Sequence, residues 1–248
     1  FCHGDADQFY TAQLSGKLEE VYFHISRPKL MSDSALTHHK GNLVHAGLGG
    51  LDTSYTGKGV VIGIVDQGID YNHPDFQNPD GSTRVLRYWD HTVNDNNHPN
   101  YYEFYEKGIL WDSAAINNGS CTSLEVSSAH GSTVSGMAAS NGLANGTNKG
   151  FAPEADLIVV ESDFSQDVYN WKLSIADACD YIFKVADSLN KPAVINLSLG
   201  DYYGMHDATD TPADAATHCK CAESVDRMFP RRGSRPWRVC NARARART

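Results

Sequence analysis

The sequence lacks several features that would place it directly in a class of protein. It has no apolar run approaching the roughly 18 residues of a membrane-spanning helix, so no membrane span is predicted. Its first residues, Phe1-Cys-His-Gly-Asp, have no initiator methionine, basic start or apolar core, so no signal peptide is recognised. We therefore expect a piece of a longer protein, and these residues leave its compartment unknown.

The cysteines are not arranged for metal binding or cross-linking. Of the six cysteines, three lie in residues 219–248, and the others are far apart with no CxxC partner. Neither a zinc site nor a disulfide framework is predicted. Cys179 lies on an apolar helical stripe and is expected to be a small buried hydrophobic residue.

Positive charge is sparse in most of the chain. Residues 219–248 hold Lys220 and eight of the eleven arginines against two acidic residues, a net charge of +7. Because the whole chain carries −9, the preceding residues carry −16. Such an acidic body argues against a nucleic-acid partner. Residues 219–248 show no hydrophobic period, and we interpret them as an atypical, out-of-frame end, with a basic nucleic-acid-binding arm as the alternative.

What is present is the pattern of a layered α/β domain. The 248 residues, 41% of them hydrophobic, suffice for a substantial core. Residues 60–65, 156–161 and 193–200 are short apolar runs rich in β-branched side chains, as buried parallel strands are. Between the last two runs, apolar residues from 168 to 189 recur every three or four positions, which predicts an amphipathic helix. This order predicts a right-handed βαβ unit and the α/β fold class, a parallel β-sheet flanked by helices.

Two polar residues lie where such a sheet would bring them together. Asp66 directly follows the run 60–65, at the carboxyl end of a strand, where α/β sheets place their ligands. His130 opens a stretch of small residues that suits a helix packed tightly against a neighbour. An aspartate that orients a histidine makes it a general base for a hydroxyl nucleophile. The alternatives are that Asp66 only caps the following turn and that His130 is a surface or capping residue.

Four segments, in order, resemble blocks of the subtilisin-like serine proteases, or subtilases. Residues 65–69 (Val-Asp-Gln-Gly-Ile) resemble the block around the family's catalytic aspartate, and residues 73–76 (His-Pro-Asp-Phe) its usual continuation. Residues 130–139 resemble the block around the catalytic histidine, and residues 150–155 the turn into the next strand. Residues 194–200 resemble the strand whose exposed edge pairs with substrate. Together these segments span a little over half of the chain.

The resemblance implies a subtilisin-like fold and a role for each matching residue. Asp66 would hold the tautomer and stabilise the cation of His130, which would take the nucleophile's proton and pass it to the leaving amine. Ser198, Leu199 and Gly200 would present backbone groups to an extended peptide or unfolded protein substrate. This chemistry requires no cofactor; structural calcium is frequent in the family, but no ligands are assigned. The family also implies an extracellular or cell-envelope location.

The departures from the family pattern concern the rest of the triad. Gln67 stands where the family usually has Ser or Thr, and the histidine block reads His130-Gly-Ser-Thr in place of His-Gly-Thr-His. The family's serine follows in a Gly-Thr-Ser-Met-Ala-type turn, and neither this block nor the segment of the oxyanion-hole asparagine occurs here. Ser234 is a poor candidate because Pro236 disfavours helical geometry at the residue between them. No nucleophile is therefore found, and we expect the fold to be incomplete at its C-terminal side.

These observations predict three parts of the chain. Residues 1–50 are an N-terminal segment, which the resemblance makes a candidate for the end of an inhibitory propeptide. Residues 51–218 are a partial subtilase catalytic domain, and residues 219–248 are the basic tail. The predicted function is that of a serine-type endopeptidase by family, inactive in this chain because the serine and asparagine blocks are missing. The alternative is a non-catalytic peptide-binding pseudo-protease of the same fold.

Two further hypotheses concern short polar or glycine-rich segments. A nucleotide-binding domain is suggested by Gly57-Lys-Gly59 and by the glycines of residues 142–150, but the first segment lacks the spacing of a phosphate loop and precedes its strand. A metal site at His73 and Asp75 is suggested by their proximity, but Pro74 and the turn explain the pair.

Overall fold

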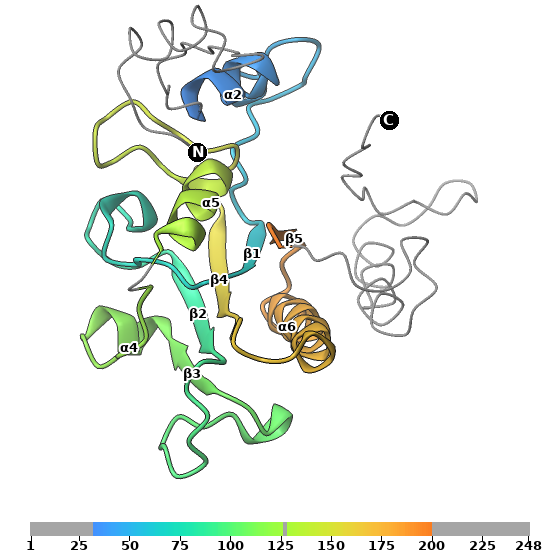
Figure 1. Ribbon diagram of the computed structural model, residues 1–248. Helices are drawn as coiled ribbons and strands as arrows, with labels where there is room; N and C mark the ends of the chain where they lie inside the picture. Colours follow the sequence, from blue (N-terminus) through green and yellow to red (C-terminus); the bar gives the residue numbers. More distant parts are fainter. Residues whose placement is uncertain (1–31, 126–127, 200–248) are drawn as a thin grey trace, which may run out of the picture. The chain divides into compact units, whose positions relative to one another are not determined.

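The computed structural model describes residues 32–125 and 128–199 (Figure 1). The predicted substrate-contacting residue Gly200, most of the segment 1–50 and the tail 219–248 therefore lie outside the described residues. The element order is α2 (Ser32–His38), α3 (Gly41–His45), β1 (Val61–Asp66), η1 (Pro74–Phe76), β2 (Val85–Asp90), η2 (Glu103–Tyr105), β3 (Ile109–Asp112), α4 (Ser113–Asn117), α5 (His130–Ala139), β4 (Asp156–Glu161), α6 (Val168–Ser188) and β5 (Ala193–Leu197).

The described strands form one sheet with the order β3-β2-β4-β1-β5. Strand β1 lies between β4 and β5 and pairs with both in parallel, so that Ile64 lies opposite Val159 and Asn196. Strand β2 is parallel to β4, and only β3 is antiparallel to its neighbour. The α/β class predicted from the sequence is therefore confirmed. Strand β3 and helix α4 were not predicted, because elements of four or five residues show no clear period.

Strand β1 is buried on both faces because a hydrophobic layer covers each side of the sheet. Every residue of β1 is buried. Ile62 and Ile64 face the layer that includes Ala139 of α5, whereas Val61 and Val65 face the layer formed with α6. Gly63 lies so close to α6 that a methyl group on it would be 2.7 Å from Ile182. This two-sided burial explains the unbroken apolar run in the sequence.

Helix α6 matches the predicted amphipathic segment. The Asp167 carboxylate caps its first turn, because Oδ1 accepts a hydrogen bond from the Asn170 backbone N–H at 3.2 Å. Cys179 is buried in the layer between α6 and the sheet, as expected. Among the residues that the structure describes, no helix has both the length and the apolar content needed to span a bilayer.

The buried guanidinium of Arg84 connects three segments next to the sheet. Its Nη1 donates to the carbonyl oxygens of Asp75 at 2.9 Å and Ala139 at 2.7 Å. Its Nη2 donates to the carbonyl oxygen of Ala155 at 2.7 Å. Arg84 thereby fixes the C-terminal end of α5 against the start of β4 and the turn after β1. Helix α5, which begins at His130, is therefore fixed at the end opposite to the histidine.

Candidate active site

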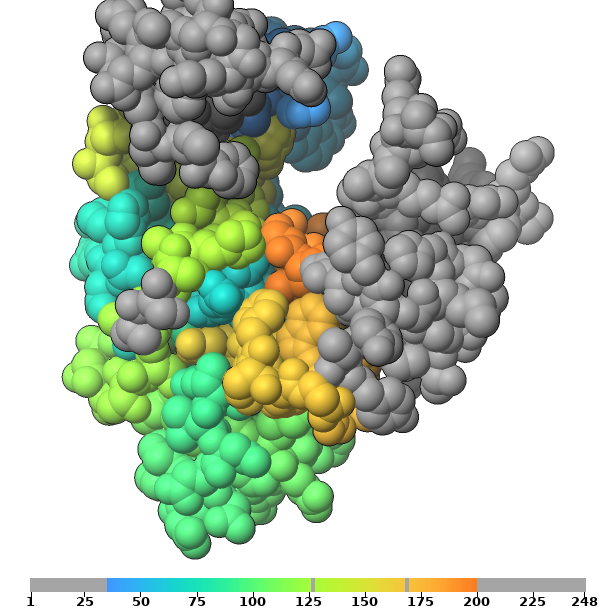
Figure 2. Space-filling model, viewed as in Figure 1, coloured from blue at the N-terminus to red at the C-terminus, as the bar shows by residue number. Residues whose placement is uncertain are grey.

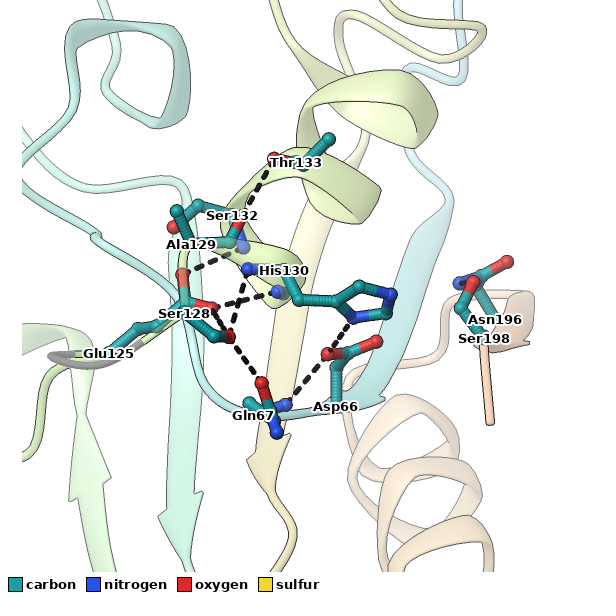
Figure 3. Close-up of polar contacts among 11 residues, drawn as sticks. Asp66, Gln67, Glu125, Ser128, Ala129, His130, Ser132, Thr133, Asn196 and Ser198 are labelled. Atoms are coloured by element: carbon teal, nitrogen blue, oxygen red, sulfur yellow. Dashed lines mark hydrogen bonds and ion pairs between the residues drawn. The ribbon is translucent and has the colours of Figure 1, made fainter. Parts of the chain in front are cut away.

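Asp66 and His130 meet at the carboxyl end of β1 (Figure 3). Asp66 is the last residue of β1 and its side chain is fully buried, whereas His130 is the first residue of α5 and its side chain is 52% exposed. Their Oδ1 and Nδ1 atoms are 2.7 Å apart. An ionised carboxylate only accepts hydrogen bonds, so Nδ1–H donates and Nε2 is left as the basic nitrogen. The two residues that the sequence singled out are thus in direct contact.

The first turn of α5 lies against the loop that follows β1. A side chain at Gly131 would overlap the carbonyl oxygen of Gly68, so glycine after His130 is required by this approach. The Asp70 backbone N–H also donates to Ser132 Oγ at 2.8 Å. The small residues after His130 therefore allow the approach that brings the imidazole to Asp66, as the sequence predicted.

The Glu125 carboxylate caps the amino end of α5. Its Oε1 accepts from the Gly131 N–H at 2.8 Å and its Oε2 from the Ser132 N–H at 2.9 Å. Both are donors that a helix leaves unpaired at its start. Sequence reasoning missed this residue, because it lies five residues before the helix and no capping motif marks it. Ala129, just before the helix, has a φ of 53°, a left-handed conformation that turns the chain into α5.

The environment of His130 favours the protonated imidazole. The hydrogen bond that Nδ1–H donates to Asp66 raises the pKa of His130 above its ordinary value, and the negative charge of Asp66 adds to this effect. In Figure 3 the ring points from α5 toward the end of β5, where Asn196 and Ser198 are drawn. A histidine that carries its Nδ1 proton toward a buried aspartate and exposes Nε2 can accept a proton from a hydroxyl group.

Two more carboxylates, the partly buried Glu161 and the buried Asp90, lie at the ends of β4, next to β1, and of β2, next to β4. In the parallel register Glu161 of β4 lies opposite Asp66 of β1 and Asp90 of β2. Glu161 Oε2 accepts from the Tyr88 hydroxyl at 2.7 Å, and Asp90 Oδ2 accepts from the Ser123 hydroxyl at 2.6 Å. Burial raises the pKa of Glu161 to about 7, with a further contribution from the charge of Asp90. Sequence reasoning missed this alignment, because the register of three strands is not visible in the sequence.

The predicted substrate-contacting residues follow β5. Ser198 is exposed, the Leu199 side chain packs against the hydrophobic layer next to α6, and Gly200 lies outside the described residues. Strand β5 ends at Leu197, three residues before the predicted end of this strand. Val194 and Leu197 are 62% and 41% exposed, and part of β5 forms surface in Figure 2.

The metal site suggested at His73 and Asp75 acquires no further ligands within the described ranges. No group of three or more His, Cys, Asp or Glu side chains in 32–125 or 128–199 is arranged to hold a metal ion. The Asp75 carboxylate accepts from the Ser140 hydroxyl and the Ala144 N–H, both at 2.8 Å. His73 Nδ1 accepts from the Asp75 N–H at 3.3 Å, which is the turn contact that the sequence suggested.

Comparisons with known proteins bear on the family of this chain. A model of the subtilase family matches residues 57–234. The chain is 32% identical over 107 residues to the minor extracellular protease Vpr of Bacillus subtilis (strain 168), covering 43% of this chain and 10% of Vpr. It is 28% identical over 155 residues to the PII-type proteinase of Lacticaseibacillus paracasei, covering 60% of this chain and 8% of the proteinase. The chain thus spans a tenth or less of the length of these relatives.

A solved structure shares the fold. The CspB protease of Clostridium perfringens superposes with a TM-score of 0.56 at 23% identity, covering 66% of this chain and 33% of CspB. At this level of identity the likeness supports the subtilisin-like fold alone.

Proposed function

Because the chain belongs to the subtilase family of serine-type proteases, we propose that Asp66 and His130 are the aspartate and histidine of an endopeptidase triad. The observation that carries this proposal is the 2.7 Å contact between Asp66 Oδ1 and His130 Nδ1 at the carboxyl end of the sheet. Both residues lie inside the segment that matches the family.

Each residue has a defined part in peptide-bond hydrolysis. The Asp66 carboxylate keeps the proton on Nδ1 and stabilises the imidazolium that forms. His130 Nε2 removes the proton from the attacking hydroxyl and then delivers it to the leaving amine, so no proton is lost to solvent between the two steps. Because His130 is 52% exposed and Asp66 is buried, the base reaches solvent while its orienting partner does not.

The substrate we propose is an extended peptide or an unfolded protein segment. Such a substrate hydrogen-bonds through its backbone, and the exposed residues at the end of β5, including Ser198, offer backbone groups for this contact. One relative is named an extracellular protease, and we place this protein outside the cytoplasmic membrane or in the cell envelope on that support. Structural calcium stays part of the proposal without assigned ligands.

The 248-residue chain is proposed to be inactive by itself, because no residue in it matches the family's nucleophile block. Loss of a triad serine costs on the order of 10⁶ in kcat, a value that was measured on subtilisin itself. We expect no hydrolysis of a fluorogenic peptide above the buffer rate. Turnover that disappears in His130→Ala, but persists in His38→Ala at an exposed histidine of α2, would show that the chain is active.

The second candidate function is peptide binding without catalysis. The exposed Val194 and Leu197 on β5 favour it, because a peptide could pack against them whether or not His130 acts as a base. The encoding DNA separates the two functions. A reading frame past residue 218 that continues with a Gly-Asn block and a Gly-Thr-Ser block supports the endopeptidase, and protein made in that frame should show His130-dependent hydrolysis. A genuine stop without such a frame supports peptide binding.

A further inference from the structure

The turn after Asp66 is packed between two layers. Gly68, two residues after Asp66, has a φ of 93°, in the left-handed region that favours glycine. Its carbonyl oxygen lies against Gly131 of α5, as described above. A methyl group on Gly68 would also overlap the Tyr88 hydroxyl and lie 3.0 Å from the Glu161 carboxyl carbon. The backbone at Gly68 therefore has no room to move toward either layer.

Tyr88 and Glu161 form the layer beneath this turn. Tyr88 is fully buried in β2, and its hydroxyl donates to Glu161 Oε2 at 2.7 Å. The same hydroxyl accepts from the Ile69 backbone N–H, at 3.4 Å. A tyrosine hydroxyl can donate one hydrogen bond and accept others, so both contacts are compatible. The carboxylate of Glu161 thus fixes the hydroxyl in the orientation that the turn requires.

The position of Asp66 depends on this turn. Asp66 is the last residue of β1, and its Oδ1 accepts from the Gln67 N–H at 2.8 Å as well as from His130. A shift of Gly68 would displace Gln67, its chain neighbour, relative to the first turn of α5, which lies against the Gly68 carbonyl oxygen. A change in the Oδ1 to Nδ1 distance follows, since the two atoms belong to the two segments that meet at Gly68.

We propose that Glu161, acting through the Tyr88 hydroxyl, is a positioning residue for the Asp66–His130 pair. Its role is geometric: the hydrogen-bonded pair supports the Gly68–Ile69 turn and so sets the distance between Asp66 and His130. The proposal rests on the proposed function for the catalytic role of Asp66 and His130. Its test needs no turnover, however, so it can fail while the proposed function stands, and the reverse also holds.

The test is a pH titration of the His130 imidazole by NMR in the whole 248-residue chain. His130→Ala identifies the signal among the eleven histidines. In Tyr88→Phe we expect the pKa of His130 to fall by about half a unit or more toward its ordinary value, because the Asp66 carboxylate moves away. Tyr105→Phe is the matched control: it removes a tyrosine hydroxyl that donates to Asp180 at 2.5 Å, away from Asp66, and should leave the pKa of His130 unchanged.

Glu161→Gln distinguishes the hydrogen-bonding role of Glu161 from the effect of its negative charge on the pKa of His130. The glutamine side-chain oxygen still accepts from Tyr88, whereas the negative charge is gone, so the pKa of His130 should stay at the wild-type value. A fall in this variant would attribute the effect to charge and overturn the proposal. An unchanged pKa in folded Tyr88→Phe would overturn it as well. If Tyr88→Phe does not fold, Glu161→Met removes the acceptor instead, and a wild-type pKa in that variant contradicts the proposal.

Discussion

Glu161 should make the stability of the protein depend on pH, and Glu161→Gln should remove this dependence. Burial raises the pKa of Glu161 from 4.5 to about 7 in the folded protein, and the charges of Asp90 and Glu125 add to the shift. In the unfolded chain the carboxyl group is exposed to water and titrates at its ordinary value. The folded state therefore binds more protons than the unfolded state between these two pKa values.

The sign and size of the effect follow from this difference. Where the folded state binds more protons, the free energy of unfolding falls as pH rises. The stabilisation is complete below the unfolded pKa of 4.5 and is lost as pH rises through about 7. One unit of pKa difference corresponds to about 1.4 kcal/mol, so ionisation of Glu161 should destabilise the fold by about 3 kcal/mol. Glutamine keeps the hydrogen bond from Tyr88 and does not titrate.

The measurement is urea unfolding followed by tryptophan fluorescence, at pH values from about 4.5 to about 8, which bracket the titration. The unfolding free energy of Glu161→Gln minus that of wild type should increase by about 3 kcal/mol from the lowest to the highest pH. Other titrating groups are common to both proteins and cancel from the difference. Glu103→Gln, at an exposed glutamate of η2, should show no such rise. A difference that stays constant with pH for Glu161→Gln would refute the reasoning.

Three other changes test the contacts that build the site. Arg84→Leu should lower the free energy of unfolding by about 3 kcal/mol or more, because it leaves buried carbonyl groups without donors, and urea unfolding measures the loss. Gly131→Ala should destabilise the protein strongly, because the added methyl group would overlap the Gly68 carbonyl oxygen. Gly136→Ala on the same helix is the control: its methyl group meets open space and should stabilise the protein by about 0.5 kcal/mol or more. Thermal unfolding measures both effects. Asp66→Asn should lower the pKa of His130 toward its ordinary value, which an NMR titration would show; an unchanged value would contradict the assignment of the shift to Asp66.

The sequence alone was sufficient for the elements whose pattern is local. Strands β1 and β4 and helix α6 show their burial directly in the order of apolar residues, since a strand buried on both faces or a one-sided helix leaves a short-range period. Asp66 and His130 were found because each lies in a contiguous block that resembles the subtilases. Their contact, observed at 2.7 Å, was an expectation from these blocks and the strand-end position.

The tertiary structure alone decided which residues surround that pair. The position of β1 between β4 and β5 places Glu161 next to Asp66, and these residues are 95 positions apart in the chain. Tyr88 likewise acts on a segment distant from its own, through a contact that no period or motif records. Glu125 is nearer in the chain to the helix that it caps, but no motif marks it. A local pattern reports what a residue's own helix or strand buries, whereas strand register and the approach of two backbones depend on the whole packed core. Asp66 and His130 could therefore be identified from the sequence, but the residues that hold them in place could not.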